Sequence, residues 1–275
     1  MHNRKRIATG LVISGGWLAL LFFGPFWLFW LTFLALGAMS LNEYYGMTLA
    51  NFSRIDKMTG TVLGLFPLLA AFEGRFEIVS AALFLSLFFL IVYSLTRYST
   101  LNDKDSEANG LVLMMRLGFG IFYVGFSFSH FTLLLTLEKG RDLLILLTVI
   151  TVFSDSFAYY TGMFFGKHKL APAISPGKTI EGFLGGIVGS ILGAIGVGQM
   201  FFPAFPMLQM VILTTILSMI GVMGDLTESM IKRTMGVKDS GNILPGHGGV
   251  LDRLDSLMIA TPVLFYILYF GVIKI

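Results

Sequence analysis

Long apolar segments separated by short polar breaks run along the whole chain. A helix needs about 20 mostly apolar residues to cross a bilayer, and the breaks divide the chain into about nine such segments. We expect these helices near residues 7–23, 26–42, 58–72, 78–96, 110–137, 143–165, 182–202, 207–224 and 257–273. Only Gly24 and Pro25 separate the first two, so a single bent element there would reduce the number to about eight. The pattern predicts an all-α, polytopic membrane protein.

The composition agrees with this fold class. Of the 275 residues, 55% are hydrophobic and 13% are charged, whereas soluble domains contain roughly 25% charged residues. No cysteine is present, which excludes disulfides, thiolate catalysis and cysteine-based metal sites. The net charge of +3 does not indicate nucleic-acid binding, because excess Lys and Arg in membrane proteins usually lie in cytoplasmic loops. We therefore expect membrane lipid, and no nucleic acid, as a partner.

The start of the chain bears on location and orientation. Positive charges precede an apolar run, as in a signal peptide, but no small-residue cleavage site follows, so we interpret this run as a retained span. With a cytoplasmic N-terminus and nine spans, most of the 19 Lys and Arg residues fall on the cytoplasmic side. The polar loops 166–181 and 225–256 then both face the cytoplasm, which predicts an active site near that face. No organelle-targeting segment is evident, so a bacterial inner membrane is the expected location.

Most of the unusual polar residues lie in the second half of the chain. We divide the single membrane unit into N-terminal transmembrane helices, 1–140, and a C-terminal catalytic region, 141–275. The most polar stretch of this region is 229–255, SMIKRTMGVKDSGNILPGHGGVLDRLD. It contains four cations that together suit several phosphates: Lys232, Arg233, Lys238 and Arg253.

Glycines in the same stretch surround His247. Gly246, Gly248 and Gly249 have no side-chain bulk, so their backbone amides can approach an anion closely. His247 can donate to a phosphate oxygen. The predicted ligand is therefore a polyphosphate rather than one simple phosphate ester.

Several carboxylates accompany these cations. Asp155 lies within an apolar segment, where an ionised acid is costly unless it is paired or solvated, so an intramembrane acid indicates function. Asp225 and Glu228 end another apolar segment, and Asp252 and Asp255 begin the last one. Two such pairs can hold Mg²⁺, which prefers carboxylate oxygens together with water and phosphate. The alternatives are a buried interhelical hydrogen bond for Asp155 and helix capping for the acids near helix starts.

The segment SPGKTIEG, 175–182, contains Gly-Lys-Thr but is not a P-loop. That motif requires another glycine upstream and a preceding strand, whereas the context here is helical. The segment instead predicts a Ser-Pro turn at Ser175, an exposed Lys178 and a helix start whose amides favour phosphate. An ordinary helix cap is an equally good interpretation.

Glycines also recur every four residues along the segment 182–202. Gly185, Gly189 and Gly193 form one series, and Gly182 and Gly186 form another. Such spacing allows close approach between membrane helices, so we expect tight packing along this helix. No internal repeat of the kind found in inverted-repeat transporters is evident.

These motifs resemble those of the membrane phosphatidate cytidylyltransferases, or CDP-diacylglycerol synthases. The family signature is Ser, two residues, Lys-Arg, four residues and Lys-Asp, then Pro-x-His-Gly-Gly and Asp-Arg-x-Asp, and it matches Ser229 through Asp255. SPGKTIEG resembles the family's Ser-Pro-x-Lys-Thr-x-Glu-Gly segment. The helix with Asp155, Ala158, Tyr159, Gly162 and Gly166 also resembles a family motif. The match covers about the last 120 residues, and the first 140 agree only in being apolar.

The resemblance implies transfer of CMP from CTP to phosphatidate, giving CDP-diacylglycerol and pyrophosphate, with Mg²⁺ required. It also suggests a homodimer, and a second metal or a monovalent ion is compatible with the site. By position, Asp225 and Asp252 are the expected metal ligands, supported by Asp255 and Asp155. The groups expected to bind substrate phosphates or assist catalysis are Ser175, Lys178, Lys232, Arg233, Lys238, His247, Gly248, Gly249 and Arg253.

Two other functions fit part of the sequence. A secondary transporter is favoured by the many spans and by Asp155, but disfavoured by the missing repeat and by the concentration of charge at one face. A CDP-alcohol phosphotransferase also handles CDP-lipids, but its Asp-Gly-x-x-Ala-Arg run is absent from the sequence. CMP transfer is therefore the expected function, with transport as the alternative.

Overall fold

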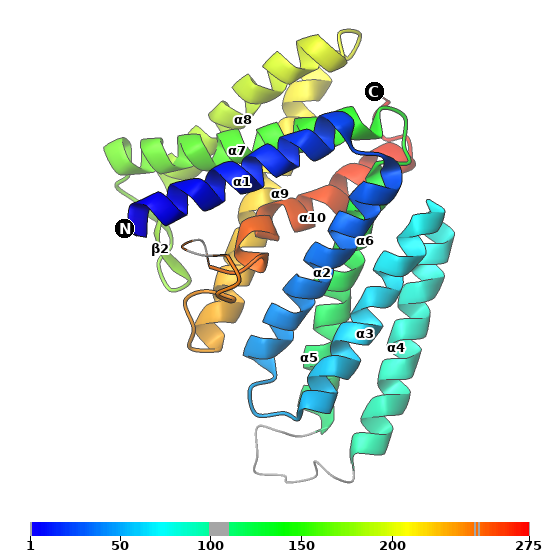
Figure 1. The fold of residues 1–275 in the computed structure, drawn as a ribbon. Helices are drawn as coiled ribbons and strands as arrows, with labels where there is room; N and C mark the ends of the chain where they lie inside the picture. Colours follow the sequence, from blue (N-terminus) through cyan, green and yellow to red (C-terminus); the bar gives the residue numbers. More distant parts are fainter. Residues whose placement is uncertain (1, 99–109, 245, 247, 275) are drawn as a thin grey trace. The chain divides into compact units, whose positions relative to one another are not determined.

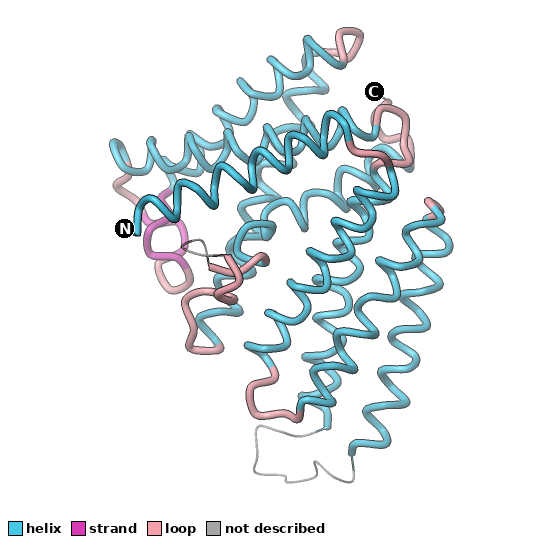
Figure 2. The backbone as a smooth tube through the Cα atoms, in the orientation of Figure 1, coloured by secondary structure: helices cyan, strands magenta, loops and turns pink. Residues whose placement is uncertain are grey.

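The computed structural model describes residues 2–98, 110–244, 246 and 248–274. Helices dominate this part of the chain, and its only strands form one short hairpin (Figures 1 and 2). The chain packs as two compact units: residues 1–133 with 239–252, and residues 134–238 with 253–275. Residues 229–255 are therefore divided between the units.

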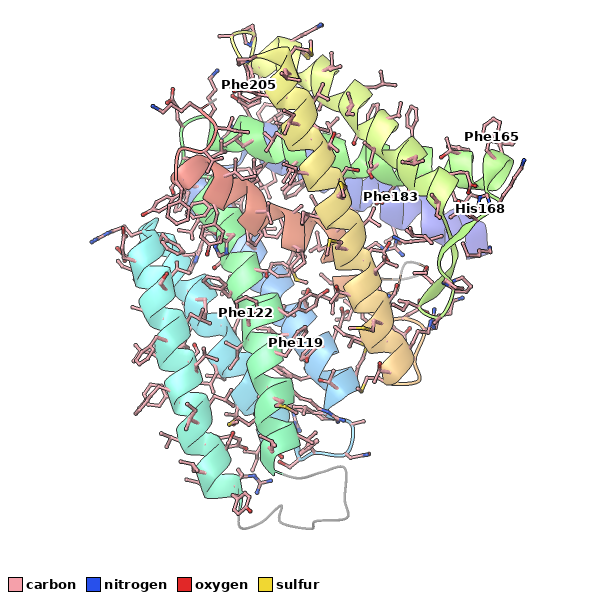
Figure 3. All side chains as sticks on the ribbon, turned by 180° about the vertical axis from the view of Figure 1, so that it is seen from behind. Phe119, Phe122, Phe165, His168, Phe183 and Phe205 are labelled. Carbon is pink, nitrogen blue, oxygen red and sulfur yellow. The ribbon has the colours of Figure 1, made fainter. Side chains whose placement is uncertain are left out.

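The first unit contains the N-terminal helices. Their bounds are α1 His2–Phe23, α2 Phe26–Thr48, α3 Arg54–Ala70, the 3-10 turn η1 Ala71–Glu73, α4 Phe76–Tyr98, α5 Gly110–Gly120, the π-helical turn η2 Ile121–Phe126 and α6 Ser127–Leu134. The last three follow one another without a break, as a single span. In Figure 3, Phe119 and Phe122 mark this span, and both side chains are exposed.

The second unit contains most of the C-terminal half. Its elements are α7 Gly140–Phe165, β1 Lys169–Ala171, β2 Ser175–Thr179, α8 Ile180–Phe201 and α9 Met207–Thr234, together with most of α10 Leu251–Tyr269. In Figure 3, Phe165 and His168 mark the end of α7 and the approach to the hairpin.

The expected polytopic, all-α class is confirmed. All nine predicted segments are helical, and seven helices in the described part of the chain are long and apolar enough to cross a membrane. α1 contributes only a shorter apolar helix, Thr9–Phe23, and α10 is not among the seven. The total of nine spans stays a prediction.

One predicted boundary is wrong. Residues 225–256 were expected to form a loop, but α9 continues to Thr234 and α10 begins at Leu251. The charged end of α9 remains helical because Glu228 and Lys232 are four residues apart and form an ion pair along the helix. The connection between the two helices is residues 235–250.

Buried polar contacts and small residues hold the first unit together. The Tyr45 hydroxyl donates to the carbonyl oxygen of Leu117 at 2.9 Å, and a Cβ on Gly60 would lie 2.7 Å from the Tyr45 ring. At the start of α3, buried Asp56 caps the helix with Ser53 and pairs with Arg97 at 3.0 Å. The ionised Asp56 is therefore matched by a cation and hydrogen bonds.

The glycine series on α8 packs against α7, as predicted. A Cβ on Gly182 would lie 2.8 Å from the carbonyl oxygen of Ala158, and one on Gly186 would lie 2.9 Å from that of Ser154. A Cβ on Gly193 would instead meet side-chain atoms, 2.9 Å from both the Phe153 ring and Val149 Cγ1. Only glycine allows these backbones to come so close.

Candidate active site

The β1–β2 hairpin joins α7 to α8 and carries Lys178. Lys169 pairs with Thr179, and Ala171 pairs with Ser175. Thr179 is the N-cap of α8, and its hydroxyl accepts a hydrogen bond from the Gly182 N–H at 3.1 Å. The predicted helix start is confirmed, whereas the predicted turn at Ser175 and the exposed Lys178 are wrong. Both residues lie in strand β2, and the side chain of Lys178 is only 25% exposed. Lys178 precedes the cap residue and is held by the end of β2.

Glu181, in the first turn of α8, fixes the other end of the hairpin. Its carboxylate accepts hydrogen bonds from the backbone N–H groups of Lys167 at 3.0 Å and His168 at 3.2 Å. His168 Nδ1 lies 2.6 Å from the same carboxylate. The hairpin is thus attached to α8 at both ends, which limits the positions that Lys178 can reach.

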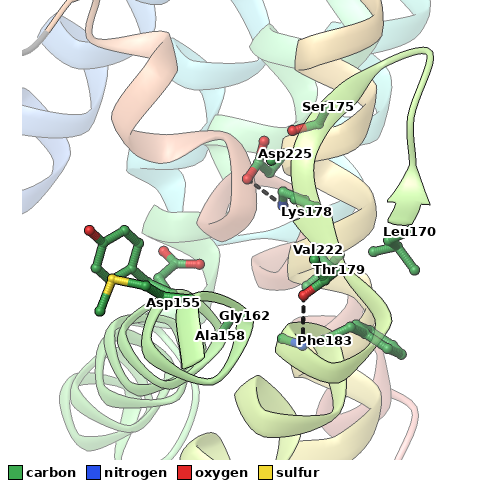
Figure 4. Close-up of a pocket in the computed structure, with 14 residues that line it drawn as sticks. Asp155, Ala158, Gly162, Leu170, Ser175, Lys178, Thr179, Phe183, Val222 and Asp225 are labelled. Carbon is green, nitrogen blue, oxygen red and sulfur yellow. Dashed lines mark hydrogen bonds and ion pairs between the residues drawn. The ribbon is translucent and has the colours of Figure 1, made fainter. Parts of the chain in front are cut away.

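A cavity of about 510 Å³ opens beside the hairpin, inside the second unit (Figure 4). Its walls come from α7, the hairpin, α8 and α9. The lining residues are Asp155, Ala158, Tyr159, Gly162, Met163, Leu170, Ser175, Gly177, Lys178, Thr179, Gly182, Phe183, Val222 and Asp225. The helix of Asp155 therefore forms one wall of the cavity, and Ser175, Lys178 and Asp225 line the same space.

A lysine and an aspartate form an ion pair at this cavity. Lys178 Nζ lies 2.5 Å from Asp225 Oδ2, as the dashed line in Figure 4 shows. The other carboxylate oxygen of Asp225 accepts a hydrogen bond from the Ser229 hydroxyl at 3.2 Å. The side chains of Lys178 and Asp225 are 25% and 30% exposed, so a ligand in the cavity can reach the pair.

Two more acids of the second unit add negative charge. Asp225 repels both Asp155 and Asp255, while Lys178 and Arg253 attract Asp155. Carboxylate oxygens are hard donors of the kind that Mg²⁺ prefers. Among the residues that the structure describes, no group of three or more His, Asp or Glu side chains is arranged to hold a metal ion. The role of these acids as metal ligands stays a prediction.

The cations at the end of α9 and beyond have different surroundings. Lys232 is 8% exposed, and its Nζ lies 2.8 Å from Oε2 of the buried Glu228. Arg233 is exposed and donates to the Val237 carbonyl oxygen at 3.2 Å, and Lys238 and Arg253 are exposed. A phosphate role for Lys232 would require a change in its contact with Glu228, and the phosphate roles of all four cations stay predictions.

Residues 239–250, the glycine-rich part of the connection, belong to the first unit. The Leu244 N–H donates to the Gly248 carbonyl oxygen at 3.0 Å, which closes a tight turn. Gly246 and Gly248 have φ angles of 76° and 82°, in the left-handed region that glycine adopts most readily. Pro245 and His247 lie outside the described residues, so the phosphate contact expected of His247 stays a prediction.

Asp252 organises the end of this connection. Its Oδ2 accepts hydrogen bonds from the Ser240 N–H at 2.9 Å, the Ser240 hydroxyl at 2.9 Å and the Gly249 N–H at 2.8 Å. Asp252 therefore holds the Ser240 and Gly249 backbone beside the start of α10. The Gly249 amide, expected to meet a phosphate, is directed to Asp252. The metal role of Asp252 stays a prediction.

Glu43 on α2 is the site-related residue that the sequence interpretation missed. It is 5% exposed, and its carboxylate accepts hydrogen bonds from the Val250 and Leu251 N–H groups, both at 2.9 Å. The signal was available, because Glu43 is an acid next to a long apolar run. The helix predicted for residues 26–42 ends just before Glu43, which places Glu43 in the polar break that follows.

The likeness to known proteins extends over both units of the chain. Residues 4–270 match the model of the cytidylyltransferase family. The chain belongs to this family. The relatives of this family member include a phosphatidate cytidylyltransferase of Bacillus subtilis, 33% identical over 268 residues, which are 96% of this chain and 97% of the relative.

Staphylococcal relatives of this cytidylyltransferase-family member carry the same name. The protein of Staphylococcus epidermidis is 39% identical over 230 residues, and that of Staphylococcus aureus is 34% identical over 233 residues. Each alignment covers 83% of this chain and 85% of the relative. These matches confirm the family suggested by the motifs, extend the likeness into the N-terminal helices and give no support to a transporter. This family member is therefore an integral membrane enzyme.

Proposed function

We propose that this protein transfers CMP from CTP to phosphatidate and releases CDP-diacylglycerol and pyrophosphate. The observation that carries the proposal is the match, along nearly the whole chain, to proteins named phosphatidate cytidylyltransferase. The cavity of the second unit supports it, since it places a lysine and aspartates beside an open space. Such groups suit a reaction between two phosphate-bearing substrates.

The chemistry requires one bond to form and one to break. A phosphate oxygen of phosphatidate bonds to the α-phosphorus of CTP, while the bond from that phosphorus to the oxygen bridging to the β-phosphate breaks. Pyrophosphate leaves with the electron pair. The attacking monoester is largely dianionic at neutral pH, so no general base is needed, and catalysis consists of positioning and charge stabilisation.

Lys178 is the residue best placed to bind a phosphate of CTP. In the structure its charge is neutralised by Asp225. A triphosphate entering the cavity competes with Asp225 for the ammonium group, because phosphate oxygens are strong acceptors for it. Arg253, which attracts Asp155 electrostatically, adds positive charge within the same unit.

Mg²⁺ is the cofactor that we propose. The acids of the second unit fit it chemically, since Asp155, Asp225 and Asp255 are hard oxygen donors that repel one another. Asp225 would be the main ligand, with Asp155 and Asp255 in support. When bound, the ion supplies positive charge that stabilises the triphosphate and the leaving pyrophosphate. A second metal or a monovalent ion is compatible with the same donors.

The proposed setting is a bacterial inner membrane with the N-terminus and the active site on the cytoplasmic side. The distribution of Lys and Arg along the sequence supports this orientation, and the bacterial relatives support the type of cell. CTP is water-soluble and phosphatidate is a lipid, so a site at the cytoplasmic face can receive both. The proposed assembly is a homodimer, on the strength of the family resemblance.

Purified protein in detergent tests the activity. With CTP, phosphatidate and Mg²⁺, we expect CDP-diacylglycerol and pyrophosphate in equal amounts, measured by mass spectrometry and by a pyrophosphate assay. Diacylglycerol in place of phosphatidate lacks the attacking phosphate and should give neither product. EDTA should stop the reaction and added Mg²⁺ should restore it. Absence of both products from folded, Mg²⁺-supplied protein would refute the proposal.

A further inference from the structure

We infer that Glu43 is a positioning residue for CMP transfer: its buried carboxylate holds the backbone at the end of the glycine-rich connection, and with it Asp252. The inference rests on the proposed function for its catalytic consequence. Its structural part rests on contacts within the first unit alone. It gives an N-terminal helix a direct part in arranging residues 240–251 of the same unit.

Both oxygens of Glu43 are used. Oε1 accepts a hydrogen bond from the Val250 N–H and Oε2 accepts one from the Leu251 N–H, each at 2.9 Å. The Ser240 hydroxyl lies 3.2 Å from Oε2. Val250 and Leu251 are 3% and 0% exposed, so water cannot easily replace the carboxylate. These buried amides depend on an acid that lies about 200 positions earlier in the chain.

The negative charge of Glu43 suits this position. Leu251 is the first residue of α10, and the first N–H groups of a helix have no acceptor within the helix. An anion there also interacts favourably with the helix dipole. A neutral glutamine would present an NH₂ group in place of one carboxylate oxygen and would leave one backbone donor without an acceptor.

Two glycines show how closely the connection fits around this acid. A Cβ on Gly241 would lie 2.6 Å from Glu43 Oε1, and a Cβ on Gly249 would lie 2.6 Å from Oε2. The Gly249 N–H in turn donates to Asp252, and the Ser240 hydroxyl lies within hydrogen-bonding distance of both Asp252 and Glu43. The two acids therefore hold neighbouring backbone groups, and displacement of Glu43 should also move Asp252.

The substitution Glu43→Gln tests this role in the full-length protein. Glu77→Gln is the matched control, because Glu77 also lies on a helix of the first unit but its side chain is 63% exposed. Hydrogen exchange of the 249–251 amides, measured without substrate, reports on the loop independently of activity. Values of kcat and KM for CTP, measured on the folded fraction, report on catalysis.

For Glu43→Gln we expect faster exchange at Val250 and Leu251, unchanged exchange in α7 and α8, and a kcat lowered about 10- to 100-fold, the size of effect that small misplacements produce. Glu43→Asp keeps the charge but is shorter, so its kcat should lie between those of wild type and Glu43→Gln. Glu77→Gln should match wild type. Normal exchange and normal kcat in folded Glu43→Gln would overturn the inference, as would a lower melting temperature with normal turnover of the folded fraction.

Ser240→Ala provides a second test if Glu43→Gln does not fold. It removes the hydroxyl that lies near both Glu43 Oε2 and Asp252 Oδ2, and we expect moderately faster exchange at residues 249–251 together with a several-fold lower kcat. Wild-type values for both would count against the inference. If wild-type protein made no CDP-diacylglycerol while Glu43→Gln still accelerated exchange at Val250 and Leu251, the loop-holding role would stand and the proposed function would fail.

Discussion

Glu43 in the first unit and Asp225 in the second are both acids on transmembrane helices, but their oxygens meet different partners. Glu43 is almost fully buried and accepts hydrogen bonds from backbone N–H groups. Asp225 lines a cavity and pairs with the side chain of Lys178. Backbone donors cannot leave without a change in the chain path, whereas a lysine side chain can exchange one anion for another.

This difference separates two uses of intramembrane acids. A carboxylate saturated by backbone groups fixes a loop, since its removal leaves several buried donors without acceptors. A carboxylate that shares a cavity with a cation is available to a metal or substrate. Glu43 and Asp225 are both acids, so residue type does not separate their proposed roles. The burial of the carboxylate and the kind of group that it contacts do separate them.

The largest effect is expected from Asp225→Asn. Loss of this charge removes the main proposed metal ligand and the partner of Lys178, so kcat should fall by about 100-fold or more while the melting temperature stays close to that of wild type. Asp142→Asn, in the first turn of α7, is the control and should leave kcat unchanged. Wild-type turnover by folded Asp225→Asn would remove Asp225 from the catalytic centre.

An intermediate effect is expected from Lys178→Met, which keeps the length of the side chain but not its charge. If Lys178 binds a phosphate of CTP, the KM for CTP should rise about 10-fold, equivalent to about 1.4 kcal/mol, with a smaller change in KM for phosphatidate. Lys178→Arg should recover part of the loss. Equal KM values for Lys178→Met and wild type would show that Lys178 serves only to neutralise Asp225.

The smallest effect on catalysis is expected from Gly186→Ala, which tests the packing that forms the cavity wall. Its Cβ would lie 2.9 Å from the Ser154 carbonyl oxygen, so α7 and α8 must separate, at a cost of about 1–3 kcal/mol. The thermal midpoint should fall, with at most a several-fold loss of activity. Gly196→Ala, on the same helix with no atom within 4 Å of the new Cβ, should not lower it. Equal midpoints would contradict the packing role.

Much of the fold follows from the sequence because its main features are local. Runs of apolar residues predict the helices, and four-residue glycine spacing predicts close packing along α8, although not that α7 is its partner. The position of Asp155 in an apolar segment indicates function, and Asp155 does line the cavity. Each of these conclusions depends on residues within a single helix.

The remaining features depend on contacts between distant parts of the chain. The partners of Glu43 are 197 to 208 positions away, and no spacing rule connects them. Residues 229–255 form one motif in sequence, yet they pack in two units. The hairpin was also missed, because its strands have only three and five residues and lack a clear alternating pattern.

The most direct test of CMP transfer is the fate of each CTP phosphate. Purified protein is supplied with phosphatidate, Mg²⁺ and CTP labelled at either the α- or the γ-phosphorus, and the lipid and water phases are separated. We predict α-label in the lipid phase and γ-label only in pyrophosphate. Label from the γ-phosphorus in the lipid would indicate phosphoryl transfer instead, and absence of α-label from the lipid would contradict nucleotidyl transfer by this protein.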